Sequence, residues 1–140
     1  MRRIAFLAAV LTSAPAVSAP PAAPAPAVEE VVRSFAAAGD ARDLTALQTL
    51  LHPGFRVVAD MGPGAVSTLD RATYLSLLEQ GKIGGGARAV ELSEIQVDRN
   101  IATVRATLTR TDAVFHTTWT LAQTEQRWQI VQDAVWMKVR

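Results

Sequence analysis

The 140-residue chain has no cysteine and only two histidines and one tyrosine, and no block of basic residues interrupts it. Without cysteine, the chain can form no disulfide and carry no lipoprotein anchor. Fourteen Lys and Arg residues face 13 Asp and Glu residues, whereas binding to a phosphate backbone requires clustered Lys and Arg. We therefore expect no nucleic-acid partner.

Motifs of metal, nucleotide and hydrolase sites are also absent from the sequence. The two histidines, His52 and His116, are far apart, and neither His-x-His nor His-Glu-x-x-His spacing occurs. There is no Gly-x-Ser-x-Gly, no P-loop and no dinucleotide-binding glycine motif. The run Gly84-Gly85-Gly86 follows an expected helix instead of a strand, which is typical of a flexible loop. We expect no metal site and no cofactor.

The N-terminus has the three regions of a secretory signal peptide. Arg2 and Arg3 form a positive start, the apolar run 4–11 is too short to span a bilayer, and small residues follow. Small-x-small cleavage patterns end at Ala16 and at Ala19. We interpret residues 1–19 as a signal peptide cleaved between 16 and 19, which predicts a periplasmic or secreted protein. A fraying N-terminal helix is the alternative.

A proline-rich stretch follows this segment. Residues 14–27 contain seven Ala and five Pro, and each Pro biases the preceding residue toward an extended backbone. We expect residues 20–27 to form a stiff tether outside the core. Removal of the signal changes the formal net charge from +1 to −1, and no remaining stretch is apolar enough to cross a membrane.

Residues 28–140 have the length of one domain, and the hydrophobic period changes inside it at Leu51–Val58. Before this segment, apolar residues recur every three to four positions, which predicts two helices. Their buried stripes are Val28, Val31, Val32 and Phe35, then Leu44, Leu47, Leu50 and Leu51. Gly39 suits the cap that ends the first helix. Pro53-Gly54 predicts a sharp turn into the first strand.

After this segment most of the pattern is strand-like. Alternation predicts strands around 55–60, 90–97, 102–109, 115–121 and 128–136. A change of phase at Ser93-Glu94 predicts a β-bulge, and a third helix is bounded by Asp70 and Gly81. The order is helix, helix, strand, strand, helix and four strands. It predicts an α+β fold with three helices packed on a curved, mostly antiparallel sheet.

The order of elements, the Leu51-His52-Pro53-Gly54-Phe55 segment and the closing strand 126–131 resemble the nuclear transport factor 2-like (NTF2-like) superfamily. The resemblance covers nearly all of residues 27–140. This superfamily includes SnoaL-like proteins, ketosteroid isomerases and a branch named "putative lumazine-binding". The resemblance implies a cone-shaped, cystatin-like fold with an apolar pocket between sheet and helices. The superfamily contains both enzymes and non-catalytic proteins, so the function must be argued from the pocket.

The resemblance to ketosteroid isomerases implies a proton-shuttling carboxylate at the end of the first strand, where this chain has Asp60. The tyrosine donor of that family corresponds to Val32 here, and its protonated aspartate falls near Thr117. Valine has no donor and threonine is a weak substitute, so this departure argues against isomerase activity. The alternative for Asp60 is a turn residue whose carboxylate binds amides around Met61-Gly62.

The histidines have structural as well as chemical interpretations. His52 lies at the expected end of a helix, where a cation offsets the helix dipole. His116 lies in the middle of a strand and could accept a proton near neutral pH, which makes it a candidate catalytic residue. Its phase is opposite to that of Phe115 and Trp119, however, which predicts that it points to the other face of the sheet.

Aromatic side chains are the feature that best predicts a pocket. Six of them converge on the cone in the predicted phases, and core packing is the alternative for any one of them: Phe35, Phe55, Tyr74, Phe115, Trp119 and Trp136. Gln132 and Asp60 could orient a ligand by hydrogen bonds. We therefore expect a non-catalytic domain that binds a small apolar or aromatic molecule. An isomerase, dehydratase or cyclase with Asp60 as general base is the first alternative.

The second alternative is a protein-interaction module that uses the other face of the sheet. The polar residues expected on that face are Arg105, Thr107, His116, Thr118 and Asp133. The last strand adds Val131, Val135, Met137 and Val139, which make the face too apolar for a fully hydrated surface. We therefore expect a homodimer packed sheet to sheet, as the resemblance also implies.

Overall fold

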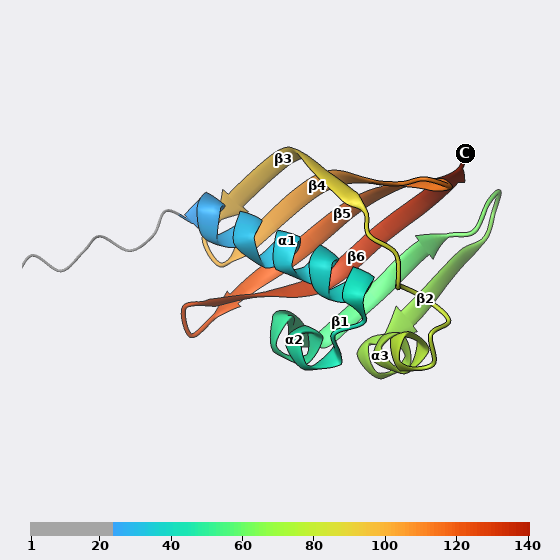
Figure 1. Ribbon diagram of the computed structural model, residues 1–140. Coiled ribbons are helices and arrows are strands. Elements are labelled where there is room, and N and C mark those ends of the chain that lie inside the picture. The colour runs from blue at the N-terminus through green and yellow to red at the C-terminus, as the bar shows by residue number, and fades with distance from the viewer. Residues whose placement is uncertain (1–23) are drawn as a thin grey trace, which may run out of the picture.

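The computed structural model describes residues 24–140, so the predicted signal peptide lies outside the described residues. Two layers form the domain: a six-stranded curved sheet and three helices on one of its faces (Figure 1). The longest helix lies across the sheet, and the two short helices lie at the end where it stops. The predicted α+β class and the predicted order of elements are confirmed.

The first helix, α1 (Pro24–Ala41), begins inside the segment expected to be an extended tether. Pro24 and Pro26 occupy its first turn, where proline is tolerated because the first amides have no acceptor within the helix. A helix therefore replaces the expected tether over residues 24–27. Gly39 does not end this helix as predicted, since α1 continues to Ala41 and Arg42 takes the left-handed conformation, with φ of 53°.

Aspartate side chains cap the two short helices, α2 (Leu44–Leu50) and α3 (Arg71–Glu79). Asp43 accepts a hydrogen bond from the amide of Ala46 (3.1 Å), and Asp70 accepts one from the amide of Thr73 (2.8 Å). Each bond satisfies one of the amides that a helix leaves free at its start. The hydrogen bonds from Thr73 also lower the pKa of the Asp70 carboxyl.

The sheet places the first strand of the chain beside the last. Its order is β2-β1-β6-β5-β4-β3, and β1 and β6 are its parallel pair, whereas the other neighbours run antiparallel. The strands are β1 (Leu51–Asp60), β2 (Val66–Asp70), β3 (Ala89–Asp98), β4 (Ile101–Arg110), β5 (Ala113–Thr124) and β6 (Arg127–Val139).

Register shifts interrupt three strands of this sheet. The predicted bulge in β3 is confirmed, with Ser93 as the extra residue and its Oγ donating to the carbonyl oxygen of Arg105 (3.2 Å). Val131 is the extra residue in β6, opposite an unbroken stretch of β5. Extra residues of this kind reverse the side-chain phase of the strand that carries them.

The third shift lies at the Pro53-Gly54 segment. This segment belongs to β1, so the prediction of a sharp turn ahead of the first strand is wrong. Leu51 already pairs with β6, and regular pairing resumes at Arg56. Between them, His52 Nδ1 accepts a hydrogen bond from the amide of Gly54 (2.9 Å). An imidazole nitrogen that accepts carries no proton. His52 thus stabilises the irregular strand as an acceptor, and not as a cation at a helix end.

The hydrophobic core fills the space between the helices and the sheet. Its largest fully buried side chains come from both layers and include Leu47, Phe55, Trp119, Leu121 and Ile130. Burial of one side chain of this size contributes about 1.5–3 kcal/mol. Core residues of both layers, among them Phe35, Leu108 and Trp119, also line the cavity described below.

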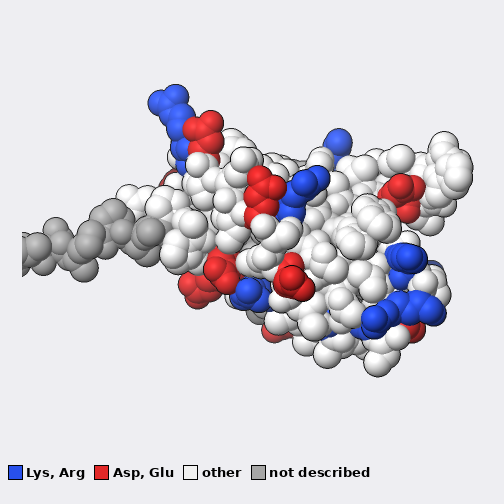
Figure 2. Space-filling model, turned by 90° about the horizontal axis from the view of Figure 1, so that it is seen from above, with Lys and Arg blue, Asp and Glu red and all other residues white. Residues whose placement is uncertain are grey.

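The surface carries both signs of charge. Figure 2 shows Lys and Arg side chains interspersed with Asp and Glu, and wide uncharged areas between them. Among residues 24–140, the helices are too short or too polar to cross a membrane.

The loop that follows α3 is held against the end of α1. Arg42 donates from Nε to the carbonyl oxygen of Ile83 (3.0 Å) and from Nη2 to those of Gly81 (3.0 Å) and Gly84 (3.1 Å). Gly84 has φ of +72°, and a Cβ there would lie 2.5 Å from the carbonyl oxygen of Gly39. This approach requires glycine, and the expectation that the glycine run forms a flexible loop is wrong for this position.

We predict that Gly84→Ala destabilises the domain more than Gly64→Ala. The two glycines have φ of +72° and +71°, where a side chain costs about 1–2 kcal/mol. A Cβ at Gly64 meets open space, whereas overpacking at Gly84 adds about 1–3 kcal/mol. Urea unfolding followed by circular dichroism measures both losses. Equal losses would contradict the close packing of this loop on α1.

Candidate functional site

A cavity of about 250 Å³ lies between the helices and the sheet. Its apolar lining comes from both layers and from the loop after α3, and comprises Phe35, Val57, Ala59, Leu69, Tyr74, Leu78, Ile83, Leu108, Phe115, Trp119 and Val135. The polar side chains of the lining are Asp40, Arg88, Arg110, Thr117 and Asp133. Apolar walls with a few convergent polar groups are typical of small-molecule sites.

Four of the seven predicted pocket residues line this cavity, namely Phe35, Tyr74, Phe115 and Trp119. Phe35 meets Trp119 edge-on, with ring centroids 5.9 Å apart, and lies 6.3 Å from the ring of Tyr74. Phe55 packs behind them, 5.2 Å from the ring of Tyr74, and belongs to the core, not to the lining. Each such pair contributes about 0.5–1.5 kcal/mol, so the rings fix the shape of the wall.

The extra residue Val131 decides which side chains of β6 reach the cavity. Before it, Ile130 faces the core, and after it, Asp133 and Val135 line the cavity. Simple alternation from Ile130 would have placed Gln132 there instead. The sequence carries no clear signal for this change, because apolar residues stand at both even positions (Ala134, Trp136) and odd positions (Val135, Met137) after Val131.

Gln132 and Trp136 therefore lie on the outer face of the sheet, and the prediction that they line the pocket is wrong. Gln132 Oε1 accepts a hydrogen bond from Arg56 Nε (3.1 Å). Trp136 is 48% exposed and stacks on His116, with ring centroids 4.0 Å apart. His116 thus points to the outer face, as its phase predicts, and lies away from the cavity.

Asp60 also lies outside the cavity, which corrects the prediction that it faces the pocket. Its Oδ1 accepts a hydrogen bond from the amide of Gly62 (2.8 Å), so the interpretation as a turn residue is confirmed. Val57 and Ala59, in the opposite phase of β1, are the residues of that strand that line the cavity. Asp60 borders a neighbouring surface groove together with Met61.

Asp133 is the buried carboxyl group of the cavity, although the sequence analysis placed it on the outer face. Thr117 Oγ1 donates a hydrogen bond to Asp133 Oδ1, so the single hydroxyl hydrogen of this threonine is used within the protein and is not offered to a ligand. Burial raises the pKa of Asp133, and the hydrogen bond from Thr117, the Trp119 indole and the charge of Arg88 oppose that rise. A raised pKa favours the neutral carboxyl, which can itself donate.

Trp119 brings an unused donor to the same point. It pairs with Asp133 across β5 and β6, close enough for its indole to lower the pKa of that carboxyl. Its Nε1 is nevertheless buried without a hydrogen bond of normal geometry to any described residue. A buried donor without an acceptor costs about 1–3 kcal/mol, so an acceptor that reached it would stabilise the protein.

Tyr74 faces the cavity from α3. Burial raises the pKa of its hydroxyl, the charge of Asp133 raises it further, and the charge of Arg88 opposes the rise. The hydroxyl therefore remains protonated at neutral pH and is available as a donor. Val32, where the resemblance implied a tyrosine, is fully buried in α1 and supplies no polar group.

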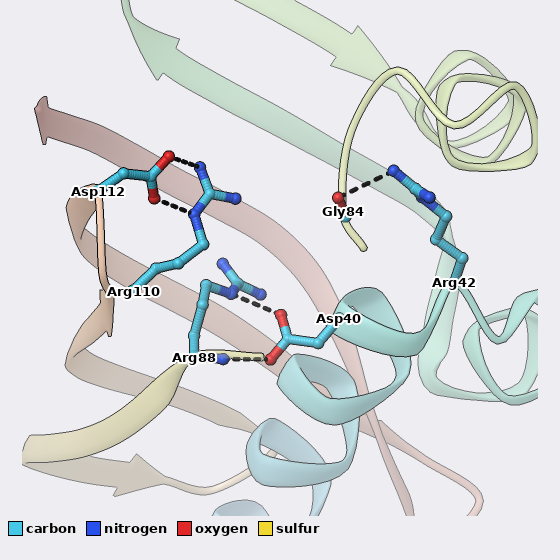
Figure 3. A network of polar contacts seen from close by, with 6 residues as sticks. All are labelled: Asp40, Arg42, Gly84, Arg88, Arg110 and Asp112. Carbon is cyan, nitrogen blue, oxygen red and sulfur yellow. Dashed lines mark hydrogen bonds and ion pairs between the residues drawn. The ribbon is translucent and has the colours of Figure 1, made fainter. Parts of the chain in front are cut away.

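Two ion pairs stand at the mouth of the cavity (Figure 3). Arg88 donates to Asp40 of α1 from its amide (3.0 Å) and from Nε (2.6 Å). Arg110 donates to Asp112 from Nε (2.5 Å) and from Nη2 (3.3 Å), and the hydrogen bond lowers the pKa of Asp112. Within residues 24–140, no three His, Asp or Glu side chains gather as the ligands of a metal ion would.

Solved structures resemble this domain along almost their whole length. An NTF2-like protein of unknown function from Silicibacter pomeroyi is 18% identical, with a TM-score of 0.68, over 82% of this chain and 94% of that one. A ketosteroid isomerase-like protein from Erwinia carotovora is 17% identical, with a TM-score of 0.64, over 81% and 95%. A cystatin-like fold protein from Burkholderia xenovorans is 16% identical, with a TM-score of 0.65, over 83% and 92%.

These identities show the fold alone, and no curated protein matches the chain in sequence. A family model does match it, over residues 23–136, under the description "Putative lumazine-binding". This span includes every helix and nearly all of the sheet described above. The chain therefore belongs to the "Putative lumazine-binding" family, and its fold is that of NTF2-like and cystatin-like proteins.

Proposed function

We propose that this protein is an exported, non-catalytic binding protein whose cavity holds a small molecule with an apolar or aromatic body. The observation that carries the proposal is the combination of aromatic walls with polar groups at one buried point, the carboxyl of Asp133 and the indole N–H of Trp119. The family description names lumazine, a flat heterocycle with carbonyl groups, and such a ligand suits these polar groups. The signal-like segment 1–19 supports a periplasmic or secreted location.

The contacts of the carboxyl groups favour binding over proton transfer. Asp133 accepts a hydrogen bond from Thr117, and the Asp40 carboxylate at the mouth is bound by Arg88. Both carboxyl groups of the lining are therefore already held by a neighbouring side chain.

A proton-transferring enzyme is the second candidate, with Asp133 in place of Asp60 as the general base. The observation that favours it is that a carboxyl of raised pKa and a phenol donor face one cavity. Such a pair can supply both a base and a donor for a developing oxyanion. Asp133→Asn separates the two functions, because a binding protein retains its ligand while an enzyme loses turnover.

We predict that small flat aromatic molecules raise the melting temperature of the protein, with lumazine and 2-naphthol as the first probes. A ligand present at 100 times its Kd stabilises the folded state by about 2.7 kcal/mol. Ala59→Leu narrows the cavity and should weaken binding at least tenfold. Ala134→Leu, an equal change on the outer face of β6, should leave it unaltered. Absence of stabilisation by every flat aromatic probe would contradict a binding role.

The pKa of Asp133 predicts how stability depends on pH. Because burial raises this pKa, the folded protein holds the proton more tightly than the unfolded chain does. The stabilising contribution is complete below about pH 4, the pKa in the unfolded chain, and is lost as the pH rises through the folded pKa. Asp133→Asn does not titrate, so it should gain stability relative to the wild type as the pH rises from 4 to 8.

Urea unfolding of both proteins across this range measures the difference. Asp112→Asn is the control, because the pKa of Asp112 is lowered and its contribution is lost only as the pH falls below about 4. The difference between Asp112→Asn and the wild type should stay flat from pH 4 to 8. A flat difference for Asp133→Asn as well would mean that this carboxyl is hydrated, against its position in the structure.

We also propose that the outer face of the sheet joins two copies of the chain. Trp136, stacked on His116 and 48% exposed, supports this proposal, and threonines of β4 and β5 surround the pair. Val135 and Met137 do not contribute to this contact, because their side chains point to the opposite face of the sheet. The apolar surface left for the contact is therefore smaller than the sequence analysis expected.

Light scattering at micromolar concentration should give twice the mass of one chain. Thr118 lies at the centre of the outer face, between Arg105 and Ala134, so Thr118→Glu should yield monomers. Thr45→Glu places the same charge on the exposed side of α2 and should leave the dimer intact. A monomeric wild type would refute the contact.

A further inference from the structure

Two arginines converge on one aromatic ring at the mouth of the cavity. Arg88 lies just before β3, and Arg110 ends β4. Their guanidinium carbons lie 5.2 Å and 5.5 Å from the centroid of the Phe115 ring, and all three side chains line the cavity. Figure 3 shows the two guanidinium groups near each other, with Asp112 beyond one and Asp40 beyond the other.

The internal ion pairs use only part of the donors that these arginines carry. A guanidinium has five N–H groups on three nitrogens. Arg88 binds Asp40 through its amide and Nε, so its Nη1 and Nη2 form no hydrogen bond with any of residues 24–140. Arg110 binds Asp112 through Nε and Nη2, and its Nη1 has no partner in the same part of the chain. Three guanidinium nitrogens at the mouth are thus open to a ligand.

The two guanidinium groups are partly exposed at the mouth. The side chains of Arg88 and Arg110 are 21% and 32% exposed, and each contacts one carboxylate, Asp40 or Asp112. These ion pairs balance the formal charge, so the free guanidinium nitrogens, and not an excess of charge, favour an acidic group at this point. The low-dielectric walls beside them strengthen their interaction with such a group.

We infer that the cavity selects a ligand that bears an acidic group, with this group at Arg88 and Arg110 and the ring against Phe35, Tyr74 and Trp119. The inference rests on the proposed binding function and adds the chemical class of the ligand, a small aromatic acid. Free guanidinium nitrogens form charge-assisted hydrogen bonds with carboxylate oxygens, which are about twice as strong as neutral ones. The carboxyl of Asp133 and the indole N–H of Trp119 line the same cavity and remain available to polar groups on the rest of the ligand.

Titration calorimetry with 2-naphthoic acid and 2-naphthamide tests this inference, because the two probes differ in charge and hardly in shape. The wild type at low ionic strength should bind the acid at least tenfold more tightly than the amide. The preference should shrink in 0.5 M salt, since part of it comes from partly exposed charges. Equal affinity for acid and amide would overturn the inference and leave the proposed function standing. Binding of neither probe would contradict both.

Variants of Arg110 distinguish the guanidinium from the net charge. Arg110→Gln should reduce the preference for the acid while the amide binds as before, since Arg88 remains. Arg110→Gln combined with Asp112→Asn keeps the net charge of the wild type and should show the same reduction. Arg105→Gln removes an arginine from the outer face of β4 and should change nothing. If Arg110→Gln weakened both probes equally, the arginine would have only a structural role and the inference would fail.

Discussion

The register of β5 and β6 depends on one extra residue, Val131, and the chemistry of the cavity follows from it. The pairing of β5 runs on unbroken opposite this residue, and β1, on the other side of β6, has its own irregularity between Leu51 and Arg56. The irregular points of the two neighbouring strands thus coincide. A slip of one position would exchange Asp133 for Gln132 and remove the carboxyl from the cone. The segment around His52 therefore influences the cavity through the register of β6, which pairs with it. None of its own side chains reaches the cavity.

Two groups at the floor of the cavity oppose folding. The carboxyl of Asp133 is taken from water and regains one hydrogen bond from Thr117, and the indole N–H of Trp119 regains none of normal geometry. Apolar side chains of the same volume would fit a core better. The aromatic contacts of Phe35 and the packed core offset this loss. Local instability of this kind is expected where a protein keeps polar groups ready for a ligand.

The sequence predicted the class of fold, the order of elements, the start of α3 at Asp70 and the bulge at Ser93, because local spacing determines each of them. It predicted four of the cavity residues for the same reason. It failed at Asp133, Gln132 and Trp136, because Ala134 and Trp136 continue the apolar alternation of the strand past Val131 and conceal the extra residue. It also missed the role of Arg42, because contacts between a helix end and a loop 40 residues later leave no periodic trace.

The three tryptophans lie in three different environments, which fluorescence spectroscopy can distinguish. Trp119 is 1% exposed in the wall of the cavity, Trp128 is 6% exposed in the core, and Trp136 is 48% exposed and stacked on His116. Indole emission responds to local polarity. The chain therefore contains its own optical reporters: a molecule that enters the cavity changes the surroundings of Trp119, while a second copy packed on the outer face changes those of Trp136. Occupation of the cavity and contact at the outer face thus have distinct signals within one unlabelled molecule.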